Sequence, residues 1–270
     1  KKKKILVLSD HALSTSGVGT QTRHLIEGLI KKGEWTFRQF GAAVKHENYE
    51  TIIVNDDFII KPIDGFGNKE LIRLTLATEK PDILFIFTDP RFFIWLFEME
   101  DEIHQVCPIV WWHVWDNKPY PIFNEVLYES TDKINCHSHM TYELIKDHFP
   151  DKTNFIPHAL PENLFYQLEE SEIRKHKVEI LGPGSEDDFV LFWMNRNAKR
   201  KRPSDLLLSW KMFLEKLSLH ERKKAKLILH TDPYDNEGPN MVATASMLGI
   251  TDTVSFSTQR IEFEKINILH

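Results

Sequence analysis

The 270-residue sequence contains only two cysteines, Cys107 and Cys136. Neither has the close Cys or His spacing that is typical of a structural zinc site. Both lie in or beside apolar runs, so we predict that they are small core side chains. Such sparing use of cysteine also suits a reducing compartment.

A long apolar run is missing as well. A membrane-spanning helix needs about 18 consecutive apolar residues, and the sequence contains no such stretch. Lys1 to Lys4 resembles the charged start of a signal peptide, but the apolar run Ile5 to Leu8 is too short and ends at Ser9 and Asp10. These absences predict a cytoplasmic protein without a membrane span. They leave open a peripheral contact with a membrane.

The sequence also lacks an excess of positive charge. The sequence has 34 Lys and Arg against 40 Asp and Glu, a formal net charge of −6. That balance argues against nucleic acid as a partner. No group of acidic residues has the pattern of a metal site, so we expect neither a metal ion nor another cofactor. Hydrophobic residues make up 41% of the chain, which is ordinary for a soluble globular protein and allows one large or two medium domains.

The chain begins with the pattern of a strand, a glycine-containing loop and a helix. The run Ile5 to Leu8 predicts a buried parallel strand, and a helix begins near Thr20. Between them, Gly17 and Gly19 are candidate substrate-binding residues, because glycine lets the backbone approach a phosphate or sugar closely. The third glycine of the dinucleotide-binding fingerprint is missing, so a flexible turn is the alternative.

Apolar runs and helical patterns then alternate along the first half of the chain. This alternation predicts a parallel sheet with helices on both faces. The predicted helices cover residues 69–78, 91–106, 121–130 and 140–148. The predicted strands cover residues 36–42, 51–54, 83–87, 108–112, 133–136 and 154–156.

Polar residues follow two of these strands and are candidate site residues. His113 opens a long aromatic loop that also contains Asp116, and His158 follows the last strand. Ligands of open parallel sheets bind past the carboxyl ends of the strands. We therefore expect His113 and Asp116 to lie near a bound ligand. We expect His158 to lie at the hinge between two domains. The alternative for each histidine is a structural role.

A second strand and helix series follows a charged, less periodic stretch. Residues 161–188 are predicted to connect a first domain, residues 1–160, with a second domain, residues 189–270. The second series has strands at 189–194, 226–230 and 253–256 and helices at 204–217 and 240–248. The sequence stops soon after the third of these strands, so we expect the second domain to be incomplete, through truncation or natural reduction.

The basic loop at residues 195–203 is the most informative segment. It contains five cations, follows the first strand of the second series and precedes a helix. A helix N-terminus adds unpaired N–H groups and partial positive charge. We predict an anion site here, suited to a diphosphate, with a solvated basic turn as the alternative. Thr231, which follows the next strand, is a further candidate ligand-binding residue.

Together these motifs resemble the retaining glycosyltransferases of family four, which have the GT-B plan of two Rossmann-like domains facing a cleft. In that family a strand ending in Arg opens the second domain, and a Lys five residues later precedes a helix. Arg196 and Lys201 match this pair. The family's first glycine loop matches Ser16 to Gly19, its histidine after a strand matches His113, and its Ile-Pro-His/Asn-Gly motif resembles Ile156 to Ala159.

The resemblance implies a hexosyltransferase-type enzyme. Such an enzyme transfers a sugar from a nucleotide-diphosphate sugar to an acceptor, with retention of configuration and usually without a metal. Arg196 and Lys201 would stabilise the charge that develops on the leaving diphosphate. His113 would complete the catalytic set by lining the donor-sugar pocket through its side chain or its carbonyl group. Thr231 would contact the nucleotide.

The chain also departs from the family pattern. Arg202 and Ala159 stand where the family usually has glycine. The family carries two glutamates, eight residues apart, late in the second domain, and Glu262 and Glu264 are too close together and too early to be that pair. The alternative function is therefore a non-catalytic or degenerate module that binds a nucleotide or a protein partner.

Overall fold

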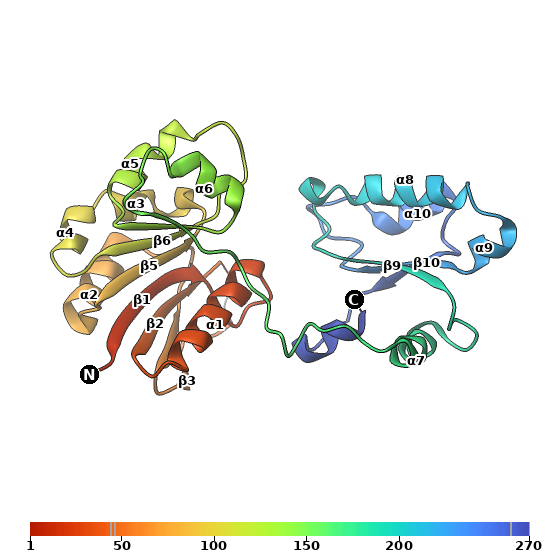
Figure 1. Ribbon diagram of the computed structural model, residues 1–270, viewed down its shortest axis with the longest axis horizontal. Coiled ribbons are helices and arrows are strands. Elements are labelled where there is room, and N and C mark those ends of the chain that lie inside the picture. The colour runs from red at the N-terminus through yellow and green to blue at the C-terminus, as the bar shows by residue number, and fades with distance from the viewer. Residues whose placement is uncertain (44, 46, 260, 270) are drawn as a thin grey trace. The chain divides into compact units, whose positions relative to one another are not determined.

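The computed structural model describes residues 1–43, 45, 47–259 and 261–269. The chain forms two compact units, Lys1–Ala159 and Leu160–His270, and each has its own sheet and its own core (Figure 1). Cys107 and Cys136 are buried in the first unit and form no disulfide, which confirms the prediction that they are core residues.

Unit 1 is built on an eight-stranded sheet with the order β3-β4-β2-β1-β5-β6-β7-β8. Every neighbouring pair is parallel except β3 and β4. The chain runs outward from β1 to one side and then returns to β5 and runs to the other, so the topological switch point lies between β1 and β5. The strands are β1 (Lys3–Asp10), β2 (Trp35–Ala42), β3 (Ile52–Asn55), β4 (Phe58–Pro62), β5 (Ile83–Thr88), β6 (Ile109–His113), β7 (Lys133–Cys136) and β8 (Thr153–Phe155).

Helices cover both faces of this sheet. Successive side chains of a strand point to opposite faces, and in β1 Leu6 and Leu8 enter the core formed with α2 to α6, whereas Ile5 and Val7 enter the core formed with α1. The helices are α1 (Gly17–Ile30), α2 (Lys69–Glu79), η1 (Pro90–Phe93), α3 (Ile94–Phe97), α4 (Glu100–His104), η2 (Ile122–Asn124), α5 (Glu125–Glu129) and α6 (His139–Ile145).

Unit 2 has a parallel three-stranded sheet with the order β11-β10-β9. One face packs against α8 and α10, and the buried indole of Trp210 donates a hydrogen bond to Thr253 Oγ1 at 3.0 Å. The α/β class with two Rossmann-like units is thus confirmed. The elements are α7 (Glu170–Leu181), β9 (Phe189–Met194), η3 (Lys199–Lys201), α8 (Pro203–Leu214), α9 (Leu219–Lys223), β10 (Ala225–His230), α10 (Met241–Leu248), β11 (Val254–Ser257) and η4 (Phe263–Leu269).

Two predictions for unit 1 were wrong. The helix expected over residues 91–106 is divided into η1, α3 and α4, because the backbone at Phe93 and Met99 leaves the helical region. Strand β4 was not expected. It follows a short turn after β3, pairs with β3 in an antiparallel hairpin, and buries Phe58 and Ile60.

Candidate functional site

The loop after β1 lies at the switch point, the position where open parallel sheets bind ligands. Ser16 caps α1, since its Oγ accepts a hydrogen bond from the Gly19 N–H at 2.9 Å. The same hydroxyl donates to Asp10 Oδ2 at 2.7 Å. Burial raises the pKa of Asp10, and the bond from Ser16 opposes that rise. The loop is therefore ordered by its own side chains before any ligand binds.

The two predicted glycines play different parts in this loop. A Cβ on Gly19 would lie 2.4 Å from the His11 carbonyl oxygen and 2.5 Å from Ser14 Oγ, so the loop fold requires glycine there. A Cβ on Gly17 would meet no atom within 4 Å. Gly17 is the first residue of α1, and its backbone faces open space where a ligand can approach.

A charged pair at the end of β5 was not predicted as part of a site. Asp89 follows β5, and its carboxylate accepts hydrogen bonds from Arg91 Nε at 2.9 Å and from Arg91 Nη2 at 2.7 Å. Burial alone would raise the pKa of Asp89, but the bonds from Arg91 outweigh it and lower that pKa. The pair lies on the other side of the switch point from Gly17. It was missed because Asp89 was interpreted only as the end of the strand and Arg91 as the first residue of the helix predicted over residues 91–106.

His113 ends β6 with a completely buried ring. Its Nε2 lies 2.8 Å from the Tyr128 hydroxyl, and its carbonyl oxygen accepts a hydrogen bond from His137 Nδ1 at 2.9 Å. Burial, together with a smaller effect of the neighbouring His137, lowers the pKa of His113 to about 3. The ring is therefore neutral at physiological pH and is not presented to solvent, contrary to the expectation of a pocket-lining side chain. Its catalytic role stays a prediction.

His158 packs on the same carboxyl edge of the sheet. Its ring stands edge-on to Trp112 and Phe87, with centroid distances of 4.9 and 5.4 Å. Partial burial lowers its pKa to about 4, helped by His137. The following residue, Ala159, is tied to α1 because its N–H and carbonyl bond the Gln21 side chain at 3.2 and 2.8 Å.

Asp116 lies in the loop after β6 and is exposed. The loop of Gly17 and Gly19, His113 and His158 all lie at this carboxyl edge of unit 1, because each is at or just after the end of a parallel strand.

In unit 2, Arg196 follows β9 and is paired with a residue that the sequence did not reveal. Its Nε donates to Asp235 Oδ2 at 2.7 Å and its Nη2 donates to Asp235 Oδ1 at 3.1 Å. The carboxylate raises the pKa of Arg196, and the guanidinium lowers the pKa of Asp235. Asp235 lies 39 residues away in the sequence, in the loop after β10.

Further contacts tie the loop after β9 to the loop after β10. Asn197 Nδ2 donates to the Pro239 carbonyl at 2.9 Å, and the Lys199 N–H donates to the Glu237 carbonyl at 3.0 Å. Gly238 lies so close to Asn197 that a Cβ would be 2.1 Å from Asn197 Oδ1. The two loops, residues 195–202 and 231–240, therefore form one surface, which we call the unit 2 platform.

The five cations of the basic loop are not equivalent. Arg196 pairs with Asp235, and Arg202 Nη2 lies 2.6 Å from Asp205 Oδ2. Lys199, Arg200 and Lys201 are exposed, and none of them forms an ion pair with a residue that the structure describes. Of these three, Lys201 lies nearest the N-terminus of α8 and is available to a ligand there.

Arg202 adopts a left-handed backbone, with φ of 51° and ψ of 48°. This conformation normally favours glycine. Glycine is also the residue that the family resemblance predicts at position 202. The turn into α8 is thus formed without glycine.

Two buried polar atoms of the platform lack partners within the described part of the chain. They are Asn197 Oδ1 and Thr231 Oγ1. Thr231 is only 8% exposed, and its N–H is already bonded to the Ser257 carbonyl at 3.0 Å. Because a buried polar atom without a hydrogen bond is unfavourable, these atoms indicate that water or a ligand completes the platform.

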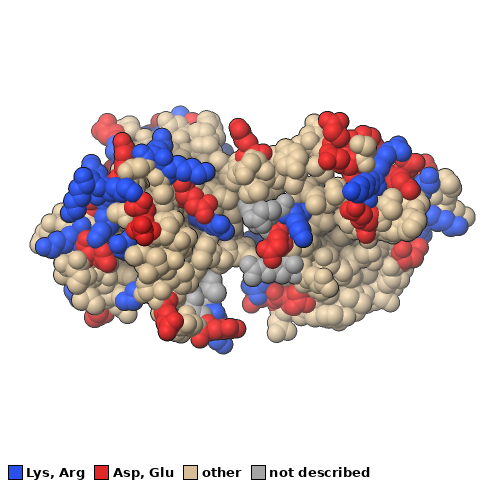
Figure 2. All heavy atoms as spheres, turned by 90° about the horizontal axis from the view of Figure 1, so that it is seen from below, with Lys and Arg blue, Asp and Glu red and all other residues tan. Residues whose placement is uncertain are grey.

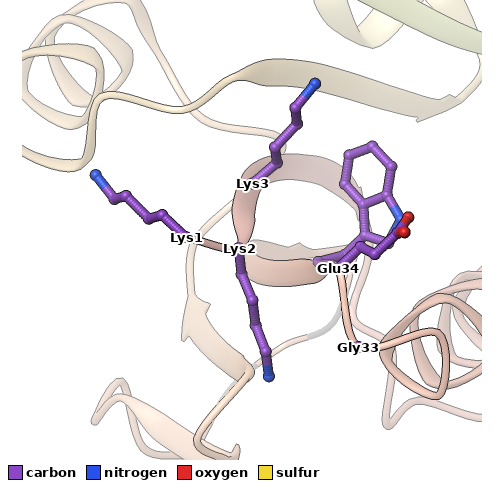
Figure 3. A pocket seen from close by; sticks show the side chains of 6 residues that line it. Lys1, Lys2, Lys3, Gly33 and Glu34 are labelled. Carbon is purple, nitrogen blue, oxygen red and sulfur yellow. The ribbon is translucent and has the colours of Figure 1, made fainter.

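Cavities also lie away from the candidate site residues, and one of about 960 Å³ in unit 2 is lined mostly by apolar side chains. A cavity of about 510 Å³ lies at the amino end of β1, on the edge opposite the candidate site. Figure 3 shows the side chains of Lys1, Lys2 and Lys3 pointing away from one another, so they do not form an anion site. Charges of both signs are mixed on the face seen in Figure 2.

Among the residues that the structure describes, no three His, Cys, Asp or Glu side chains are grouped as metal ligands would be. Within that same part of the chain, no helix has the length and apolar character needed to cross a membrane.

Comparison with known proteins gives matches among solved structures. No protein-family model matches the sequence, and a search of curated proteins finds no match. Sucrose-phosphate synthase from Thermosynechococcus elongatus is 14% identical, with a TM-score of 0.71 over 99% of this chain and 73% of that chain. A glycosyltransferase from Rickettsia africae is also 14% identical, with a TM-score of 0.66 over 99% of this chain and 71% of that one.

A third match is the N-terminal domain of Candida albicans trehalose-6-phosphate phosphatase. It is 12% identical, with a TM-score of 0.64 over 99% of this chain and 75% of that one. At such identities the likeness establishes the fold, which agrees with the two Rossmann-like units described above, and the chemistry has to be argued from the residues.

Proposed function

We propose that this protein is a glycosyltransferase that moves a sugar from a nucleotide-diphosphate sugar to an acceptor. The observation that carries the proposal is the unit 2 platform, where Arg196 and the exposed Lys201 precede the N-terminus of α8 at the carboxyl edge of a parallel sheet. Two proteins named for glycosyl transfer or sugar-phosphate synthesis share the fold over 99% of this chain. These similarities favour an anion site at the basic loop over a solvated basic turn.

The proposed chemistry follows from the charges on the platform. Breaking the bond to the sugar places negative charge on the diphosphate, and fixed cations lower the energy of that transition state. Lys201 offers a compact charge, and Arg196 keeps three of its five N–H donors after pairing with Asp235. The partial positive charge at the N-terminus of α8 adds to both. We propose that these groups stabilise the leaving group without a metal ion.

The proposed reaction retains the configuration of the sugar. This part rests on the match of Arg196, Lys201 and the segment 156–159 to the retaining family. The acceptor is proposed to bind at the carboxyl edge of unit 1, where Gly17 and the Asp89–Arg91 pair lie on either side of the switch point. We also propose a cytoplasmic location, from the sequence pattern alone.

Titration calorimetry with UDP, GDP and ADP tests the site. At least one nucleotide is expected to bind, and Arg196→Ala and Lys201→Ala are each expected to weaken binding by about tenfold, since a lost charge-assisted contact is worth roughly 1.5–3 kcal/mol. Lys216→Ala, which removes an exposed lysine beyond the other end of α8, is the matched control. Equal binding by wild type and the Arg196/Lys201 double variant would rule out this site.

A screen of nucleotide sugars with NMR detection of the anomeric product tests the reaction itself. Transfer with retained configuration is expected. Transfer with inversion would overturn the retaining mechanism, and binding without transfer or hydrolysis would favour the second candidate function.

That second candidate is a non-catalytic module that binds a nucleotide or a protein partner. Two observations favour it. The ring of His113 is buried and bonded to Tyr128, and the same fold occurs as the N-terminal domain of a protein named as a phosphatase.

A further inference from the structure

The contact between Arg196 and Asp235 raises a question about the anion site. A carboxylate beside a diphosphate site repels the ligand, so a simple basic surface would be better without Asp235. Yet Asp235 is only 18% exposed, whereas Arg196 is 62% exposed. The carboxylate is thus fixed in the fold, and the guanidinium extends outward from it.

The backbone of the loop after β10 holds Asp235 in place. Asp235 Oδ1 accepts a hydrogen bond from the Glu237 N–H at 2.9 Å, and the Asp235 carbonyl accepts one from the Gly238 N–H at 3.0 Å. The same loop is fastened to the basic loop through Asn197 and Lys199. Asp235 is therefore a rigid anchor rather than a mobile surface acid.

The geometry of the pair determines which edge of the guanidinium is available. The Asp235 carboxylate accepts hydrogen bonds from Nε and from one N–H of Nη2. The remaining three N–H groups, two on Nη1 and one on Nη2, form the second fork of the guanidinium, which matches two phosphate oxygens. An exposed arginine without such an anchor loses side-chain entropy when it binds a ligand.

We propose that Asp235 is a positioning residue that orients the Arg196 guanidinium so that its second fork faces a bound diphosphate. This inference rests on the proposed function, because it requires an anion at the platform. Asp235 acts through Arg196 and does not contact the ligand.

The test compares variants of the full chain in calorimetric titrations with inorganic pyrophosphate and with UDP, GDP and ADP. Asp235→Asn removes one negative charge and replaces one of the two oxygens that accept from Arg196 with a donating amide, so the bidentate contact is lost. Asp205→Asn removes the same charge from the other ion pair of the loop, Arg202–Asp205, without touching Arg196. Asp235→Glu keeps the charge but moves the carboxylate. The double variant Arg196→Ala/Asp235→Asn completes a mutant cycle.

Positioning predicts that D235N weakens binding about tenfold and that D235E weakens it by less. Asp205→Asn is expected to leave binding unchanged or to strengthen it slightly. In the Arg196→Ala background, D235N is expected to change affinity by less than about twofold, since nothing is left to orient. Urea denaturation of each variant verifies that it is folded.

The proposal is overturned if D235N binds as tightly as wild type or more tightly, in parallel with Asp205→Asn, because charge alone would then explain the loop. It is also overturned if D235N weakens binding equally with and without Arg196. If wild type binds none of the four anions, the proposed function fails together with this inference. If wild type binds and only the D235N effect is missing, this inference alone fails.

Discussion

Among individual residues, the buried ring of His113 ties the stability of unit 1 to pH. Burial lowers its pKa to about 3 in the folded protein, from 6.5 without burial. The unfolded chain therefore binds the proton more readily, so this contribution to stability is present above pH 6.5 and is lost as the pH falls towards 3. Between these values the free energy of unfolding is expected to fall by up to about 1.4 kcal/mol per pH unit.

Urea denaturation from pH 7 to pH 4.5 measures this slope. His113→Phe, which keeps an aromatic ring but cannot be protonated, is expected to flatten the curve over this range. A variant of the exposed His220, His220→Asn, is expected to keep the wild-type slope. Parallel curves for His113→Phe and wild type would show that the ring does not control the pH dependence.

A second residue-level prediction concerns the left-handed backbone of Arg202, whose φ is 51°. A left-handed conformation costs an L-residue about 1–2 kcal/mol, and glycine avoids most of that cost. Both Arg202→Gly and Arg202→Ala lose the exposed pair with Asp205, so comparing them isolates the backbone. We expect the glycine variant to be about 1 kcal/mol more stable than the alanine variant in chemical denaturation. Equal stability would mean that the turn changes shape when the side chain is removed.

Among the secondary-structure elements, the junction of β1 with α1 provides a matched pair of glycines. Gly19→Ala forces a Cβ to within 2.4 Å of the His11 carbonyl oxygen, so we expect a loss of roughly 1–3 kcal/mol. Gly17→Ala places a Cβ in open space at the first position of the helix. That change is expected to be neutral or to stabilise the fold by up to about 1 kcal/mol. Thermal unfolding of the two variants measures the difference, and similar losses for both would contradict the assigned roles.

The elements also show how far the sequence could predict the structure. Strands β1, β5 and β6 are short, nearly continuous apolar runs, and such runs identify buried parallel strands without knowledge of their neighbours. Strand β9 is equally apolar, but it lies at the edge of the three-stranded sheet and none of its residues is buried. The hairpin strand β4 and the division of the helix at residues 91–106 depend on turns whose shape is set by tertiary packing.

The candidate site shows the same limit. The positions of Arg196 and Lys201 could be predicted because strand, loop and helix are local patterns. Asp235 could not, because loops 39 residues apart meet only after β9 and β10 pair in register. The burial of His113 could not be predicted either, because it depends on packing against Tyr128 of α5, which hydrogen-bonds the ring.

For the molecule as a whole, the two compact units with separate cores predict that a ligand protects them unequally. The chain has a formal net charge of −6, so the cations of the unit 2 platform form a local basic site on an acidic protein. Pyrophosphate at 100 times its Kd stabilises the state that binds it by about 2.7 kcal/mol. We therefore expect slower hydrogen exchange in peptides covering residues 195–207 and 231–240, and in the neighbouring strands β9 and β10. Peptides from β1, β5 and β6 are expected to change little.

Mass-spectrometric exchange on the full chain, with Arg196→Ala as the control, measures both units in one experiment. The variant is expected to lose the protection in unit 2 at the same pyrophosphate concentration, because fewer molecules have the anion bound. Protection confined to unit 1 would place the anion site at the carboxyl edge of the larger sheet. The loop of Gly17 and Gly19 at the N-terminus of α1 would then be the phosphate-binding element, and the assignment of donor and acceptor sides to the two units would be reversed.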